Sequence, residues 1–163
     1  MSSFLDKVVR LFAYLAGTLI VVLALLIVYE ATNRYLFNAS SVTISEIQWH
    51  IFDIIFLLGL SYTMQQDKHV RVDLFYDSYS PKTKAIVDIV GTIFLIIPFI
   101  LIVIYTSYTL VEMSYLQDEI SSDPGGLSYR YLIKGMIIVG FVLLLLQSIS
   151  NLAKNIATFR EQR

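Results

Sequence analysis

The ionisable side chains best placed to do chemistry share one face of an otherwise apolar segment. Glu46, His50 and Asp53 are spaced i, i+4 and i+7 in a helix that we expect over 46–66. A charge that faces lipid is costly, so this face should meet protein or water. It could relay a proton or a cation, or it could form a polar seam with another helix or subunit. We favour the seam, because Ile54 to Leu58 offer no polar path further along the helix.

A second polar group closes the first apolar segment. Glu30 and Arg34 are spaced i, i+4 with the acid first, which is the favourable order, and Asn33 lies beside them. Arg34 could also reach Glu46 across the short turn that follows. We interpret this group as a structural clasp between the first two helices rather than as a ligand site.

Redox and metal chemistry find little support in the sequence. The chain has no cysteine, which excludes disulfide exchange and thiolate metal sites. His50 and His69 are about 28 Å apart along one helix, so they cannot ligate one haem iron from a single chain. We therefore expect no catalytic residue, no metal site and no cofactor.

Two further polar sets flank the later apolar segments. Glu112 and Lys134 belong to the set that we place on the outer side, where several tyrosines suggest an interfacial aromatic belt. Gln147 belongs to a milder inner set together with Asp88, for which Lys154 is a possible partner. No chemistry follows from the inner set.

These residues are carried by four stretches that are almost free of charge. About 20 helical residues cross a hydrocarbon core of about 30 Å. The uncharged runs are 11–29, 89–111 and 135–153, and Asp53 alone interrupts the run 47–66. The sequence therefore predicts an all-α membrane protein with four transmembrane helices.

Composition and connection lengths leave no room for a soluble catalytic domain. The chain is 56% hydrophobic, above the roughly 45 to 50% of soluble domains. We expect one domain over 1–163, in contact with the lipid bilayer and with no nucleic acid partner. The expected spans are roughly 11–36, 46–66, 82–116 and 130–153, and segment 3–15 either lies at the inner interface or prolongs the first span.

The basic residues orient these spans. Nine lie in the terminal segments and the second connection, whereas three lie in the first and third connections. By the positive-inside rule, both termini and the second connection should be cytoplasmic.

Local signals mark the ends of the spans. Ser45 is a plausible cap for the second helix, and Pro81 suits the first turn of the third. Pro98 should kink the third helix because it removes one backbone hydrogen bond. Asp123 to Gly126 form a strong turn signal before the fourth helix.

Several short motifs occur in a characteristic order along the chain. They are Asn33-Arg34-Tyr35-Leu36-Phe37, Ser45-Glu46, Tyr62, His69-Val70-Arg71-Val72-Asp73, Glu112 with Ser114, Asp123 to Leu127, Lys134 and Gln147. In this order, in a four-span protein, the chain resembles the small integral membrane subunit of tripartite ATP-independent periplasmic (TRAP) transporters, the DctQ-like family. The resemblance covers essentially the full length.

The resemblance implies a role and partners that the spans alone do not. In the family, the small subunit pairs with a large membrane subunit that holds the substrate and sodium sites and moves like an elevator. A periplasmic binding protein delivers an organic acid. The small subunit would then be a non-enzymatic scaffold in a bacterial inner membrane.

Two other classes of membrane protein are open as alternatives. The first is a stand-alone four-span exporter of the small multidrug type with Glu30 as the coupling carboxylate. Glu30 lies near the end of its span, however, beside an arginine that would hold it ionised. The second is a redox membrane anchor, which fails on the missing cysteines and the separated histidines.

Overall fold

The structure is a computed structural model that describes residues 2–66 and 79–161, and these residues contain helices but no strand. Within them, four helical stretches are long and apolar enough to cross a membrane, so the predicted all-α fold with four membrane-spanning helices is confirmed. The predicted site residues His69, Arg71 and Asp73 lie outside the described residues. The helices are α1 (Ser2–Phe37), α2 (Val42–Gln65), α4 (Pro81–Gly91), the π-helical η1 (Thr92–Ile96), α5 (Ile97–Leu116) and α6 (Tyr131–Glu161).

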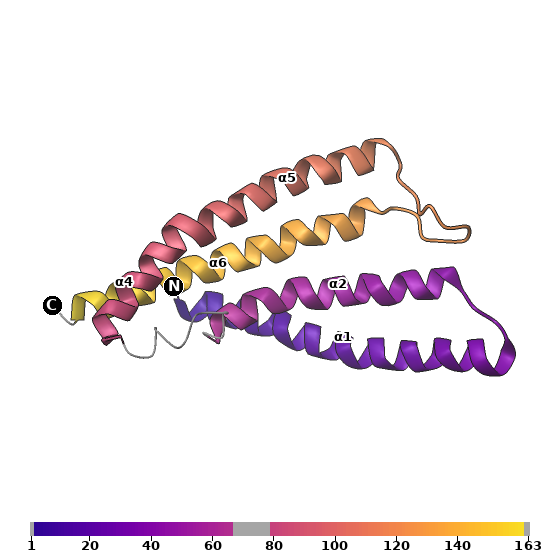
Figure 1. Ribbon diagram of the computed structural model, residues 1–163, viewed down its shortest axis with the longest axis horizontal. Helices are drawn as coiled ribbons and strands as arrows, with labels where there is room; N and C mark the ends of the chain where they lie inside the picture. The colour runs from indigo at the N-terminus through magenta and orange to yellow at the C-terminus, as the bar shows by residue number, and fades with distance from the viewer. Residues whose placement is uncertain (1, 67–78, 162–163) are drawn as a thin grey trace.

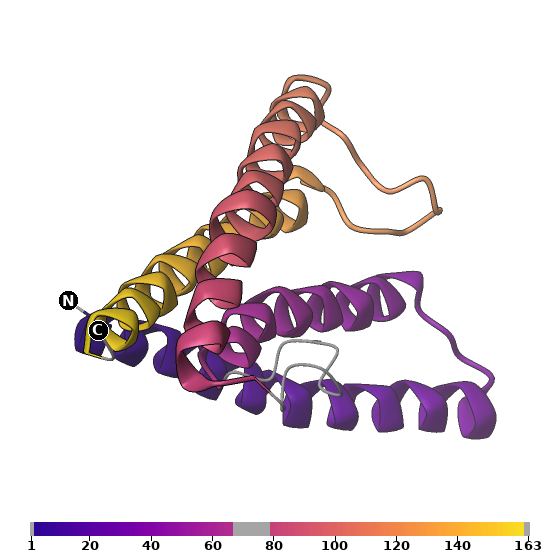
Figure 2. The same cartoon turned by 60° about the vertical axis from the view of Figure 1, so that its left-hand side comes forward.

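The helices form two antiparallel hairpins that diverge like the arms of a V (Figure 1, Figure 2). One arm is α1 with α2, and the other is α5 with α6. The arms meet through α2 and α6, and α1 also contacts α6. Both chain termini lie at the narrow end of the V, whereas the 117–130 connection lies at its wide end (Figure 1). Both α2 and α6 therefore run from the wide end towards the narrow end.

The first helix is much longer than a bilayer is thick. α1 has 36 residues, which corresponds to about 54 Å of helix against a hydrocarbon core of about 30 Å. It must tilt or project beyond the lipid. Segment 3–15 prolongs this helix without a break, which is the second of the two alternatives that the sequence allowed.

The second helix begins one turn earlier than predicted. Its cap is Ser41, whose hydroxyl accepts a hydrogen bond from the Ile44 amide at 3.4 Å. The predicted cap, Ser45, lies inside the first turn and donates instead to Glu30 at 2.9 Å. The prediction of Ser45 was wrong because a tertiary acceptor on α1 takes up its hydroxyl.

The third membrane segment is interrupted at its centre. Pro81 occupies the first turn of α4 as predicted, and the Ser80 hydroxyl caps that turn by accepting from Thr83 N–H at 3.2 Å. The π-helical η1 ends at Ile96, two residues before Pro98. Proline removes a backbone donor, and a π-helical turn changes the hydrogen-bond register. Figure 1 shows α4 and α5 meeting at an angle through this segment, in agreement with the predicted kink.

The core lies where the two arms meet. One apolar cluster joins Ala16, Leu58 and Leu143 from α1, α2 and α6. The helices approach closely at Gly140, where an added Cβ would lie 2.8 Å from Leu57 Cβ and 3.0 Å from its carbonyl oxygen. The contact between α2 and α6 therefore depends on the missing side chain at Gly140.

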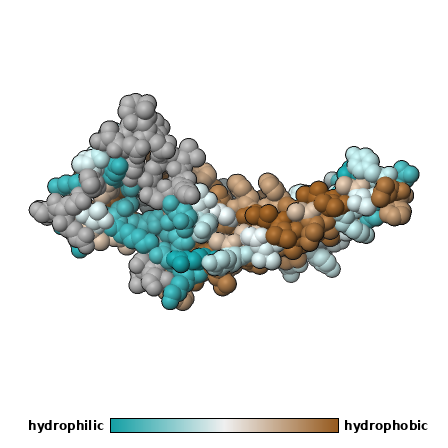
Figure 3. Space-filling model, turned by 90° about the horizontal axis from the view of Figure 1, so that it is seen from below, coloured by the Kyte–Doolittle hydropathy of each residue, from teal (hydrophilic) through white to brown (hydrophobic). Residues whose placement is uncertain are grey.

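Much of the molecule's apolar surface is exposed. Figure 3 shows, on one face, hydrophobic side chains along the middle of the molecule and hydrophilic ones towards its ends. Exposed residues on α1 include Leu25 and Val28, and those on η1 and α5 include Phe94 and Ile102. Such a surface is expected where helices face lipid or another membrane protein.

Candidate functional site

Glu30 joins α1 to α2. Its side chain is 6% exposed, and its two carboxylate oxygens accept hydrogen bonds from Ser45 Oγ at 2.9 Å and from Gln48 Nε2 at 2.8 Å. Gln48 also donates to the Leu26 carbonyl at 3.3 Å. The structure thus contains a clasp between the first two helices, built on Glu30 and Gln48. Gln48 was not among the residues predicted for this clasp.

Arg34 makes none of the hydrogen bonds of this clasp. Its side chain is exposed, and the guanidinium carbon lies 5.7 Å from the centroid of the neighbouring Tyr35 ring. Asn33 is half-buried, and its carbonyl accepts from the Ala39 amide at 3.2 Å. The predicted contact between Arg34 and Glu46 is wrong, because Glu46 points to the opposite hairpin.

Glu46 ties α2 to the 117–130 connection. It is 4% exposed, and its carboxylate accepts hydrogen bonds from the Ser121 hydroxyl and from the Leu127 backbone N–H. Arg130 lies 4.0 Å away. A buried carboxylate with two donors and a nearby cation is well compensated.

The glycines of the predicted turn make this contact possible. Gly125 has φ +82°, and its carbonyl accepts from Thr43 Oγ1 at 2.5 Å. At Gly126, an added Cβ would lie 2.5 Å from Ser121 Oγ and 2.9 Å from Glu46 Oε1. The Asp123 to Gly126 turn is therefore confirmed, and it brings the connection against α2.

Lys134, in the first turn of α6, contacts the start of the same connection. Its ammonium pairs with Glu119, whose carbonyl accepts from the Arg130 amide at 3.2 Å. The Lys134 ammonium is the main cause that holds the pKa of the Glu119 carboxyl below its ordinary value. The predicted site residue Glu112 is exposed on α5.

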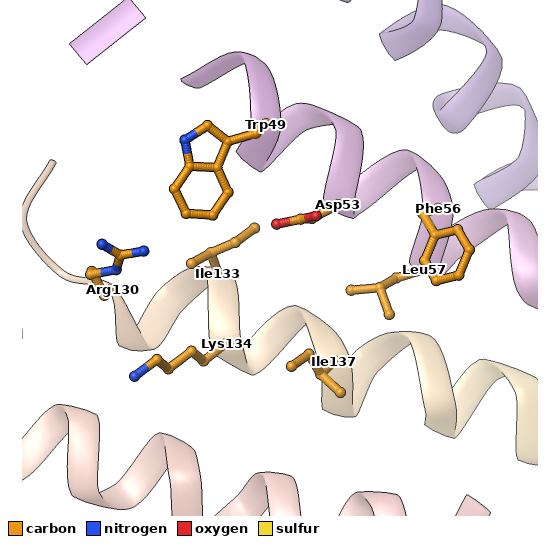
Figure 4. Close-up of a pocket in the computed structure, with 8 residues that line it drawn as sticks. All are labelled: Trp49, Asp53, Phe56, Leu57, Arg130, Ile133, Lys134 and Ile137. Atoms are coloured by element: carbon orange, nitrogen blue, oxygen red, sulfur yellow. The ribbon is translucent and has the colours of Figure 1, made fainter. Parts of the chain in front are cut away.

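His50 and Asp53 complete the predicted polar stripe on α2. The His50 ring lies 4.7 Å from the Trp49 ring, and its buried Nε2 atom has no hydrogen-bond partner among the described residues. Asp53 lines a cleft of about 320 Å³ between α2 and α6 (Figure 4). The stripe therefore meets the 117–130 connection at Glu46 and the cleft at Asp53.

Gln147 is the centre of a polar network at the narrow end. The residue is fully buried, and its amide donates to Asn151 Oδ1 at 2.9 Å and to Asp6 Oδ1 at 3.4 Å. Asp6 also receives a hydrogen bond from Lys154 at 2.9 Å, whereas the sequence suggests Asp88 as a possible partner of Lys154. The amide of Gln65 donates to the Asp6 carbonyl at 2.8 Å. This network joins α1, α2 and α6.

Several of these contact residues gave no signal in the sequence. Asp6, Gln65, Ser121 and Arg130 stand among other polar residues near the span ends, so composition does not distinguish them. Across residues 2–66 and 79–161, no group of three or more His, Cys, Asp or Glu side chains could hold a metal ion.

The apolar surface, the four long helices and the polar contacts between them define a multi-pass integral membrane protein. The family model of the DctQ component of tripartite ATP-independent periplasmic transporters matches residues 23–158. The chain belongs to this family and is a small subunit of a TRAP transporter. A comparison with curated proteins gave no match.

Proposed function

We propose that this chain is the fixed scaffold of a sodium-coupled importer of an organic acid in a bacterial inner membrane. Its partners are a large membrane subunit that carries substrate by an elevator-like motion and a periplasmic binding protein that delivers the acid. No catalytic step is assigned to the chain. The family supports the transporter role, and the arrangement of polar side chains supports the scaffold role.

The observation that carries this proposal is that the buried carboxylates of the membrane-spanning helices bind other parts of the same chain. Glu30 and Glu46 each accept two hydrogen bonds from other parts of the chain. Beyond Asp53, α2 is apolar as far as Ser61, which bonds to the Leu58 carbonyl on its own helix. A coupling site needs an ionisable group on a polar path, whereas these groups are placed to stabilise packing.

The exporter alternative is less well supported. Its coupling carboxylate, Glu30, would have to exchange protons with both sides of the membrane. Glu30 is instead buried against Ser45 and Gln48 near the wide end of the bundle. No observation favours this alternative over the scaffold.

The proposal is tested by assembly. The chain, tagged and co-expressed with the large multispanning subunit from a neighbouring reading frame, should copurify with it in detergent at a fixed stoichiometry. Uptake of the organic acid in proteoliposomes should require both subunits, the binding protein and a sodium gradient. Purification of the chain alone, with uptake intact in its absence, would refute the scaffold role.

The substitutions Asp53→Asn and Glu46→Gln should leave the sodium dependence of uptake unchanged in the assembled complex. Both substitutions remove a titratable group while keeping the shape of the side chain. If neither group belongs to the coupling machinery, the sodium stoichiometry and the pH dependence should match those of the unaltered complex. A new pH dependence in either variant, with assembly intact, would place the stripe in the coupling pathway.

The orientation is testable with single cysteines, since the chain has none of its own. Ser78 and Ser122 are suitable positions, because Ser122 is exposed whereas its neighbour Ser121 contacts Glu46. With an impermeant thiol reagent on intact cells, we expect labelling at Ser122 and protection at Ser78, as the excess of basic residues in the second connection requires. The reverse pattern would show that the predicted orientation is wrong.

A further inference from the structure

A cleft lies between α2 and α6, the helices through which the two arms of the V meet (Figure 4). Its volume is about 320 Å³, and most of its lining is apolar. Arg130 and Lys134 line it where α6 begins, and Asp53 lines it from α2. The apolar side chains of the lining are Trp49, Phe56, Leu57, Ile133 and Ile137.

Asp53 differs from the other acids of this region. It is half-buried, yet within residues 2–66 and 79–161 its carboxylate makes no hydrogen bond and no ion pair. Glu46 and Glu119, by contrast, are both held by donors from the chain. Asp53 lies two helical turns beyond Glu46, at about 10 Å further along α2. A carboxylate inside a membrane segment is costly unless a donor or a cation meets it.

The cations that line the cleft are already engaged. Lys134 pairs with Glu119, and Arg130 lies 4.0 Å from Glu46. The Arg130 guanidinium also lies 5.3 Å from the Trp49 ring centroid. Among the described residues, the two cations of the cleft lining therefore each lie beside another carboxylate, Glu46 or Glu119. The carboxylate of Asp53 is left with an uncompensated charge.

This excess charge decides between the two possible occupants of the cleft. A lipid chain would suit the apolar walls but would leave Asp53 facing hydrocarbon. The volume of about 320 Å³ admits side chains of a transmembrane helix but not the helix itself, which is about 10 to 12 Å in diameter. A basic side chain on such a helix can reach Asp53 and compensate its charge.

We propose that the α2–α6 cleft docks a transmembrane helix of the large membrane subunit, and that a lysine or arginine of that helix pairs with Asp53. This inference rests on the proposed function, because it takes the large subunit as the partner. It adds the face of the chain that meets the partner and the chemistry of the contact.

The first test compares complex yields. Asp53→Lys puts like charges in contact and should reduce the amount of large subunit that copurifies by about tenfold or more. Asp53→Asn should reduce it less, and should leave the thermal stability of the isolated small subunit unchanged, because Asp53 has no partner within the described chain. The matched control is Asp118→Asn, which removes an exposed acid from the 117–130 connection. Complex yields equal to that of the control for both Asp53 variants would overturn the proposal.

The second test leaves Asp53 unaltered, so it does not depend on how the Asp53 variants fold. Benzoylphenylalanine replaces Phe56, which is 58% exposed in the cleft wall, and the intact complex is irradiated. We expect an adduct with the large subunit. An adduct with lipid alone, or no adduct, would show that no partner helix docks over the cleft.

The two levels of the proposal fail in different ways. If the unaltered chain does not copurify with the large subunit, the proposed function itself is refuted, and the docking site with it. If the unaltered complex forms but Asp53 and Phe56 behave as control positions, the scaffold role stands and only this docking face is wrong.

Discussion

Gly140→Ala should lower the free energy of unfolding by roughly 1 to 3 kcal/mol, although alanine favours helix more than glycine does. The new Cβ would lie 2.8 Å from Leu57 Cβ and 3.0 Å from the Leu57 carbonyl oxygen. The second of these atoms is backbone, so it cannot move without shifting α2. The two arms of the V would be forced apart at this contact.

Gly135→Ala is the matched control for this prediction. It lies on the same helix, and an added Cβ there meets no atom within 4 Å. We expect it to stabilise the chain by about 0.5 to 1 kcal/mol through helix propensity alone. Thermal or denaturant unfolding in the same detergent measures both variants. Equal stabilisation by the two alanines would show that α2 and α6 are not in close contact at Gly140.

Gly126→Ala should detach the 117–130 connection from α2. The added Cβ would lie 2.5 Å from both Cβ and Oγ of Ser121, and 2.9 Å from Glu46 Oε1. Because overpacking of this kind displaces the neighbours, we expect a loss of about 1 to 3 kcal/mol. The Glu46 carboxylate would also lose its contacts with Ser121 and Leu127.

The chain's single tryptophan reports this change directly. The Arg130 guanidinium lies over the Trp49 ring, and Arg130 also lies beside Glu46. Gly126→Ala should shift the Trp49 emission to longer wavelength and increase its quenching by acrylamide. The second substitution Ser121→Gly removes the closest side chain and should partly restore both signals. An unchanged emission spectrum in Gly126→Ala would contradict the packing of the connection against α2.

The spans and several of their boundaries could be predicted from the sequence alone. Runs of about 20 residues without charge can satisfy their backbone groups in lipid only as helices, so length and hydropathy sufficed. Pro81 and the Asp123 to Gly126 turn were also predictable, because the backbone preferences of proline and glycine are local. The family motifs gave the class of transporter, which the match over 23–158 confirmed.

The partners of the polar residues could not be predicted in the same way. Spacing along a helix placed Glu46 and Asp53 on one face, but it could not predict what that face would contact. The Ser45 cap and the Arg34 contact were wrong because both were inferred from neighbours in the sequence. In the structure, Ser45 donates a hydrogen bond to Glu30, and Glu46 accepts one from a backbone amide 81 residues away.

The sequence by itself thus determined the membrane-spanning helices, because hydrophobic length and backbone preference act within a segment. Only the tertiary structure decided how the hairpins diverge, which acids are compensated and where the cleft lies. Lys154 finds Asp6 across 148 residues of chain, and Asp53 faces α6 without a partner in the described residues. These outcomes depend on the angle between α2 and α6, which is set by side-chain packing at contacts such as that of Gly140 with Leu57.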